Sequence, residues 1–214
     1  MKKTAKVLLA VLCALLLVVG SVMGTLAWLT AQEDVLNTFT VGEVYIKLDE
    51  AIVNEAGVAT GGRTEDGNAY HLYPDHEYVK DPTVTLLNGT DDCYVRMIVT
   101  ASLENALTDP LMATQLDGIF VGYDQTKWDR VEKTVSADGK TITYEYWYYA
   151  VVNAENGDNA LEPLFTSIAV PETYDNAEMQ LLEGLKINVR ADAIQKDGFA
   201  TAEEAWAAFG QQYA

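Results

Sequence analysis

The chain has 214 residues, with 32 acidic and 14 basic side chains and a formal net charge of −18. The phosphates of nucleic acids repel so acidic a protein, so we set nucleic acid binding aside. The length suits one domain with a sizeable core, preceded by a leader.

The start of the chain has the pattern of a signal peptide. Three lysines among the first six residues precede an apolar run at residues 7–19, and small residues follow up to Ala27. We predict cleavage between Ala27 and Trp28. Residues 1–27 then form a signal helix, and residues 28–214 form a single domain.

A retained anchor is the alternative, because residues 7–29 carry no charge and are long enough to span a bilayer as a helix. In that case the membrane is contacted only through the uncleaved leader. Both interpretations place the domain outside the cell. We expect the acidic composition to confer solubility there, and the alternative is weak Ca²⁺ binding by acidic loops.

The two cysteines do not predict a disulfide. Cys13 lies in the leader, and this leaves Cys93 without a partner in the domain. Cys93 begins an apolar strand, so we interpret it as a small buried hydrophobic residue.

After the leader the chain alternates between apolar and polar residues with the period of β-strands. In the first strand Val44, Ile46 and Leu48 share one face, and Lys47 and Asp49 lie on the other. Residues 50–68 are predicted to form a glycine-rich loop or an irregular hairpin. Because Pro74 interrupts residues 70–78, this stretch is predicted to be an edge strand or a segment that crosses between strands.

Two hairpins are predicted further along the chain. Asn88 and Gly89 would join strands at residues 83–87 and 93–101, and a turn at Asp138 and Gly139 would join two more. The strand at 93–101 is apolar on both faces, which predicts a central position. Further strands are expected at residues 118–123, 127–135, 141–153, 164–170 and 185–193.

Short helices complete the predicted fold. They are expected within residues 103–116, at 175–182, and from Thr201, where a capping-box sequence begins a helix whose Trp206 can dock on the body. This pattern predicts an all-β, jelly-roll-like antiparallel β-sandwich with a few short helices.

Three stretches resemble one known family. The first stretch comprises residues 78–84 (YVKDPTV) and 92–96 (DCYVR). The second comprises residues 193–199 (AIQKDGF). The third is an N-x-F-x-x-G motif that precedes the first strand. In this third stretch the matching residues are Trp28, Leu29, Asn37, Phe39, Gly42, Val44, Ile46 and Leu48. With the signal peptide, the pattern resembles the TasA/camelysin family of exported Gram-positive matrix proteins. The resemblance implies a jelly-roll fold and a leader cut by a SipW-type peptidase.

Candidate catalytic residues are few. Camelysin-like relatives have been described as metallo-endopeptidases, but His71 and His76 are five residues apart in a stretch that Pro74 makes a poor helix. The serines lie in no nucleophile-elbow motif, and the acidic turns lack the twelve-residue calcium-loop pattern. We therefore predict no catalytic site, no metal site and no cofactor.

The sequence favours a secreted structural protein, a self-associating subunit of cell-surface or biofilm-matrix fibres that assemble by β-strand addition. The alternatives are a secreted camelysin-like metallo-endopeptidase and a surface module that binds ligands through the aromatic strand at 141–153. The predicted exchange segment is apolar at Trp28, Leu29, Val35, Leu36, Phe39 and Val41. It is interpreted either as a strand added to the next subunit or as the first strand of its own domain.

Overall fold

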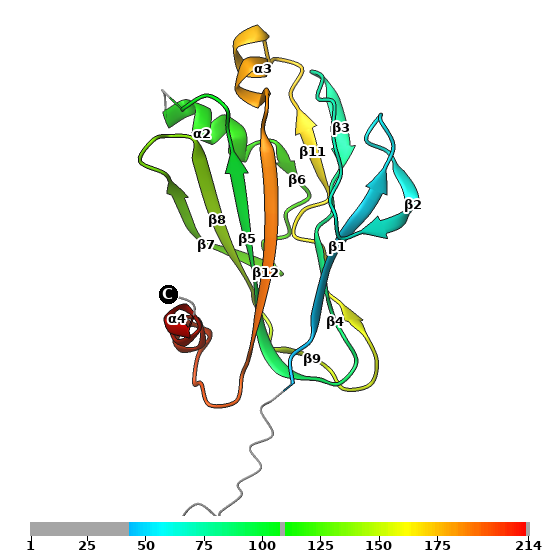
Figure 1. Cartoon of the computed structure of the whole chain (residues 1–214), viewed down its shortest axis with the longest axis vertical. Helices are drawn as coiled ribbons and strands as arrows, with labels where there is room; N and C mark the ends of the chain where they lie inside the picture. Colours follow the sequence, from blue (N-terminus) through cyan, green and yellow to red (C-terminus); the bar gives the residue numbers. More distant parts are fainter. Residues whose placement is uncertain (1–42, 108–109, 213–214) are drawn as a thin grey trace, which may run out of the picture. The chain divides into compact units, whose positions relative to one another are not determined.

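The computed structural model describes residues 43–107 and 110–212. In this part of the chain, strands in antiparallel sheets dominate, and three short helices accompany them (Figure 1). The predicted all-β, sandwich-like antiparallel fold is thereby confirmed. The predicted signal helix lies outside the described residues.

The longest sheet has the strand order β12-β5-β8-β7, and a short strand, β9, also pairs with β5. β5 lies between β12 and β8, as its two-sided apolar pattern predicts. The turn at Gly139 joins β7 to β8, so this second hairpin is confirmed. The strands are β5 (Thr90–Ser102), β7 (Trp128–Val135), β8 (Thr141–Tyr148), β9 (Val152–Ala154) and β12 (Lys186–Gln195).

Two smaller sheets pack with this one. The first has the order β10-β4-β1-β2, and the second has the order β3-β11-β6. β3 is therefore an edge strand, one of the two options predicted for the stretch around Pro74. The strands are β1 (Ile46–Val53), β2 (Ala59–Thr64), β3 (His76–Val79), β4 (Thr83–Leu86), β6 (Phe120–Val121), β10 (Asn159–Ala160) and β11 (Ser167–Val170).

The hairpin predicted at Asn88 and Gly89 is wrong. The turn forms, with Gly89 at a φ of 92° and the Thr90 N–H donating to the Leu87 carbonyl at 3.1 Å. It leads the chain from one sheet into another, because both edges of β4 are already paired, with β1 and with β10. A local turn signal does not reveal that the edges of a strand are occupied.

The three helices lie at the ends and on a face of the sheets (Figure 1). α2 (Pro110–Asp117) begins at Pro110 and overlaps the stretch at 103–116 in which helical turns are predicted. Asp175 caps α3 (Asn176–Leu182) with a capping box. α4 (Ala202–Gln212) buries Trp206, as predicted. Among the described residues, no helix combines the length and apolarity that a membrane crossing requires.

The core lies between the sheets and is built from alternate residues of the central strands. In β5, the side chains from Cys93 to Ala101 at every second position are at most 1% exposed. Burial raises the pKa of the Cys93 thiol to about 12, so this group stays protonated, as expected of a small buried hydrophobic residue. The three largest side chains that this core buries almost completely are those of Trp128, Tyr78 and Tyr144.

Candidate functional site: a buried polar cluster beside a cleft

A cleft of about 1240 Å³ opens beside the start of β12. One wall is α3 with residues 183–187, which run from the end of this helix into β12 and include Leu185 and Ile187. The other wall is the segment at residues 66–72, and Lys80 and Ile168 also contribute to the lining. The cleft therefore joins apolar side chains of the core to a group of charged and polar residues.

β1 carries two consecutive acidic residues, Asp49 and Glu50, that are each only 6% exposed. Neighbouring residues of a strand point to opposite faces, so each carboxylate needs its own set of partners. The polar cluster (Asp49, Glu50, Arg63, Asn68, Lys80 and Asp81) supplies them.

Glu50 bridges a lysine and an amide. Its Oε2 accepts a hydrogen bond from Lys80 Nζ at 2.5 Å, and its Oε1 accepts one from Asn68 Nδ2 at 2.8 Å. The lysine and glutamate side chains are only 7% and 8% exposed. A buried ion pair of this kind is stable only when both charges are paired and their remaining hydrogen-bonding groups are satisfied.

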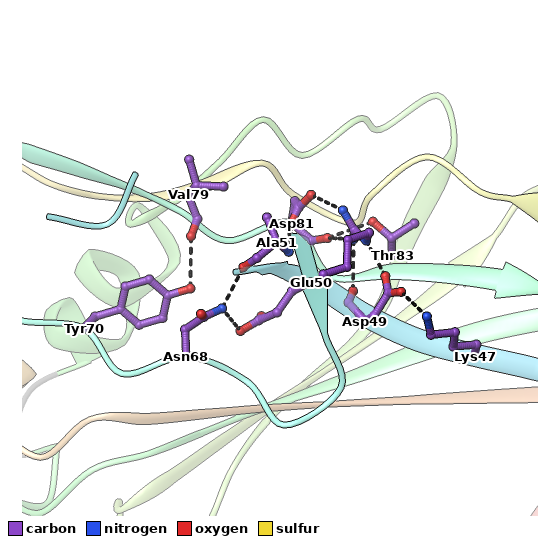
Figure 2. Close-up of polar contacts among 10 residues, drawn as sticks. Lys47, Asp49, Glu50, Ala51, Asn68, Tyr70, Val79, Asp81 and Thr83 are labelled. Carbon is purple, nitrogen blue, oxygen red and sulfur yellow. Dashed lines mark hydrogen bonds and ion pairs between the residues drawn. The ribbon is translucent and has the colours of Figure 1, made fainter. Parts of the chain in front are cut away.

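On the other face of β1, Asp49 and Asp81 together hold Arg63. The guanidinium contacts Asp49 Oδ1 at 2.5 Å and Asp81 Oδ2 at 2.8 Å, and Asp49 also pairs with Lys47 at 2.8 Å (Figure 2). Burial alone would raise the pKa of Asp49, but the hydrogen bonds from Lys47 and Arg63 outweigh it and hold the pKa below its ordinary value. Asp49 is therefore a stable carboxylate near neutral pH.

The aromatic ring of Tyr70 borders the cluster. Its hydroxyl donates to the Val79 carbonyl at 3.0 Å (Figure 2), and Lys80 Nζ lies 5.8 Å from the ring centre. Burial, assisted by the negative charge of Glu50, raises the pKa of Tyr70 well above its ordinary value. The Tyr70 hydroxyl therefore stays protonated, and its uncharged ring forms one side of the site.

Among the signal-peptide, exchange-segment and histidine candidates, only His71 and His76 belong to the described residues, and His71 is in the lining of the cleft. Ala27, Trp28, Leu29, Val35, Leu36, Phe39 and Val41 all lie outside the described residues. His71 and His76 are exposed, and His76 Nδ1 hydrogen-bonds the Pro74 carbonyl. Within residues 43–107 and 110–212, no group of three or more His, Cys, Asp or Glu side chains is arranged to hold a metal ion.

The aromatic stretch at residues 141–153 is divided between β8 and β9. Along β8 its side chains alternate between buried and half-buried positions, and Tyr149, which follows β8, is 61% exposed. Tyr144 and Tyr146 are buried, and their rings lie against Phe120 and Tyr123. This geometry favours cross-strand packing over a platform for sugars.

The polar cluster was missed in the sequence because adjacent buried charges break the alternation from which burial is inferred. The sequence pattern places Asp49 on the outer face of the first strand and Glu50 at the start of a loop, and nothing in it predicts that Lys80 is buried. One feature of the sequence does point to this region. The glycine pair Gly61 and Gly62, next to Arg63, is typical of a β-bulge, and it lies in β2, the strand that pairs with β1.

We compared the chain with family models, with curated proteins and with solved structures, and none of them matches it.

Proposed function

We propose that the protein is a secreted structural subunit that assembles into cell-surface or matrix fibres by β-strand addition, in the manner of the TasA/camelysin family. The N-terminal segment of one subunit, anchored by Val35, Leu36, Phe39 and Val41, would pair with a sheet edge of the next. Such a head-to-tail contact does not close on itself, so it extends into a filament.

The unpaired edge of β12 is the observation that carries this proposal. β12 is ten residues long and pairs with β5 along its whole length. Among the described strands, none pairs with its other side. β1 and β12 approach each other, but the backbone pairs of β1 are with β2 and β4. A long row of unpaired backbone groups is a template for an added strand.

The inner face of β12 is incompletely covered. Leu185, Ile187 and Val189 pack against the core but remain half-buried, whereas the corresponding residues of β5 are fully buried. Leu185 and Ile187 also line the cleft. A strand added at this edge could place alternate apolar side chains over these residues, which would fix its register.

The test compares the mature chain, which we expect to begin at Trp28, with a variant that lacks residues 28–37. We expect the truncated protein to be a folded, soluble monomer that no longer polymerises. Electron microscopy and sedimentation measure polymerisation, and far-ultraviolet circular dichroism measures folding. An unfolded truncated protein, or one that forms fibres as readily as the mature chain, would show that exchange through this segment is wrong.

A matched pair of substitutions tests the acceptor edge. Ile187→Asp places a charge on the half-buried inner face and should reduce polymerisation at least tenfold. Asn188→Asp, one residue away on the exposed face, should leave polymerisation unchanged. Equal fibre yields from two folded variants would exclude β12 as the acceptor.

A further inference from the structure

The lysine and the amide that share Glu50 have the arrangement needed for a covalent bond between side chains. Lys80 Nζ lies 2.5 Å from Glu50 Oε2, and Asn68 Nδ2 lies 2.8 Å from Glu50 Oε1. One carboxylate therefore holds an amine next to a carboxamide. We propose that Lys80 and Asn68 become joined by an isopeptide bond, and that Glu50 moves the proton that this reaction requires.

The amine must be neutral to act as a nucleophile. Lys80 is buried, and the carboxylate of Glu50 is within hydrogen-bonding reach of its ammonium group. Transfer of one proton from Lys80 to Glu50 converts a buried ion pair into a neutral amine and a neutral acid. This transfer removes the cost of keeping two charges away from water.

The carboxamide of Asn68 is held and polarised by the backbone of β1. The Val53 N–H donates to Asn68 Oδ1 at 3.1 Å, and Asn68 Nδ2 donates to the Ala51 carbonyl at 2.8 Å (Figure 2). Attack on the side-chain carbon would place negative charge on Oδ1, where the Val53 N–H already points. A fixed donor at a developing oxyanion stabilises the transition state.

The reaction balances without an oxidant or any co-reactant. The Lys80 Nζ forms a bond to Asn68 Cγ, and the bond from Cγ to Nδ2 breaks. Of the three protons on the Lys80 ammonium, one stays on the new amide, and Glu50 carries the other two in turn to the departing nitrogen, which leaves as ammonium. The products are one secondary amide and one ammonium ion, and Glu50 is again a carboxylate.

The surroundings suit this chemistry. Tyr70 covers the lysine on one side, and the cleft is lined by Asn68, Tyr70 and Lys80, which gives the ammonia a route to solvent. The bond would tie the segment that follows β2 to the segment between β3 and β4. It is independent of fibre formation, because all three groups belong to one subunit.

Mass spectrometry of the purified protein tests the proposal. The linked chain should be lighter than its sequence by one ammonia, about 17 Da. Trypsin does not cleave after an acylated lysine, so residues 64–96 should appear as one fragment that carries this loss. A fragment that ends at Lys80 with its full sequence mass would overturn the proposal. So would a loss of one water, about 18 Da, located on Glu50 and Lys80.

Variants assign the roles. Asn68→Ala, Lys80→Arg and Glu50→Gln should each abolish the mass loss, with circular dichroism as the check on folding. Asn153→Ala is the matched control, because Asn153 donates to Asp92 at 2.7 Å in an exposed pair, and it should keep the loss. A folded Glu50→Gln protein that is still linked would show that Glu50 does not move the proton.

Discussion

Two buried cations in this protein are both paired with carboxylates but differ in their other neighbours. Arg96 lies on the outer face of the largest sheet, between Asp192 at 2.9 Å and Glu145 at 3.0 Å, on the strands to either side. Trp206 of α4 covers it, with the Arg96 guanidinium carbon 4.5 Å from the ring centre. Lys80, in contrast, lies between strands and is held by Glu50, which it shares with an amide.

This difference separates a structural contact from a potentially reactive one. A guanidinium stays charged and is a poor nucleophile, and the two hydrogen-bond acceptors of Arg96 are both carboxylates. Lysine can lose its proton, and a carboxamide can accept an amine in exchange for ammonia. Burial and charge pairing are similar in the two clusters, so the chemical identity of the groups decides what each cluster can do.

The largest effect is expected at the arginine. Arg96→Met leaves Asp192 and Glu145 without their buried partner, which should lower the free energy of unfolding by about 3–5 kcal/mol. The control is Arg190→Met, because Arg190 contacts the same Asp192 oxygen at 3.0 Å but is 60% exposed. Its loss should cost about 1 kcal/mol or less. Denaturant unfolding of both proteins measures the two effects, and equal losses would refute this account of the cluster.

A smaller effect is expected at Asp49, and it should depend on pH. Asp49→Asn removes charge-assisted hydrogen bonds to Lys47 and Arg63 and should cost about 1.5–3 kcal/mol near neutral pH. The native pKa of Asp49 lies below the ordinary 3.8. As the pH falls, the unfolded chain therefore takes up this proton first, and the stabilisation by Asp49 is lost through the native pKa.

Unfolding measured between pH 7 and pH 2 should therefore show a shallower acid decline for Asp49→Asn than for the native protein. Glu65→Gln is the control, since Glu65 is exposed and lies 3.8 Å from Lys47. It should leave the curve almost unchanged. If the free energy of unfolding falls equally steeply with decreasing pH in Asp49→Asn and in the native protein, Asp49 does not contribute to the loss of stability in acid.

The smallest effect concerns how α4 covers Arg96. The buried Trp206 Nε1 has no hydrogen-bond partner among the described residues, whereas Trp128 Nε1 donates to the Glu162 carbonyl at 3.0 Å. Trp206→Phe should therefore be less destabilising than Trp128→Phe by about 1 kcal/mol, the net contribution of one hydrogen bond. Thermal unfolding of the two variants measures the difference, and a larger loss at Trp206 would show that its N–H has a partner.

The sequence by itself determined the strands whose burial alternates and the helices with caps. The apolar pattern of residues 93–101 predicted a central strand. Asp175 and Thr201 predicted where helices start, and Trp206 predicted that the last helix packs on the domain. Each of these signals is local, because side chains two residues apart in a strand, or one turn apart in a helix, share a face.

Only the tertiary structure decided which strands pair and which charges meet. β4 joins β1 instead of β5, and Glu50 finds Asn68 and Lys80, which lie 18 and 30 residues away along the chain. A buried charge is tolerated where a partner from another segment satisfies it, so its burial cannot be read from its neighbours in sequence. The fold was therefore predictable from periodicity, whereas the polar cluster became visible only when distant segments were brought together.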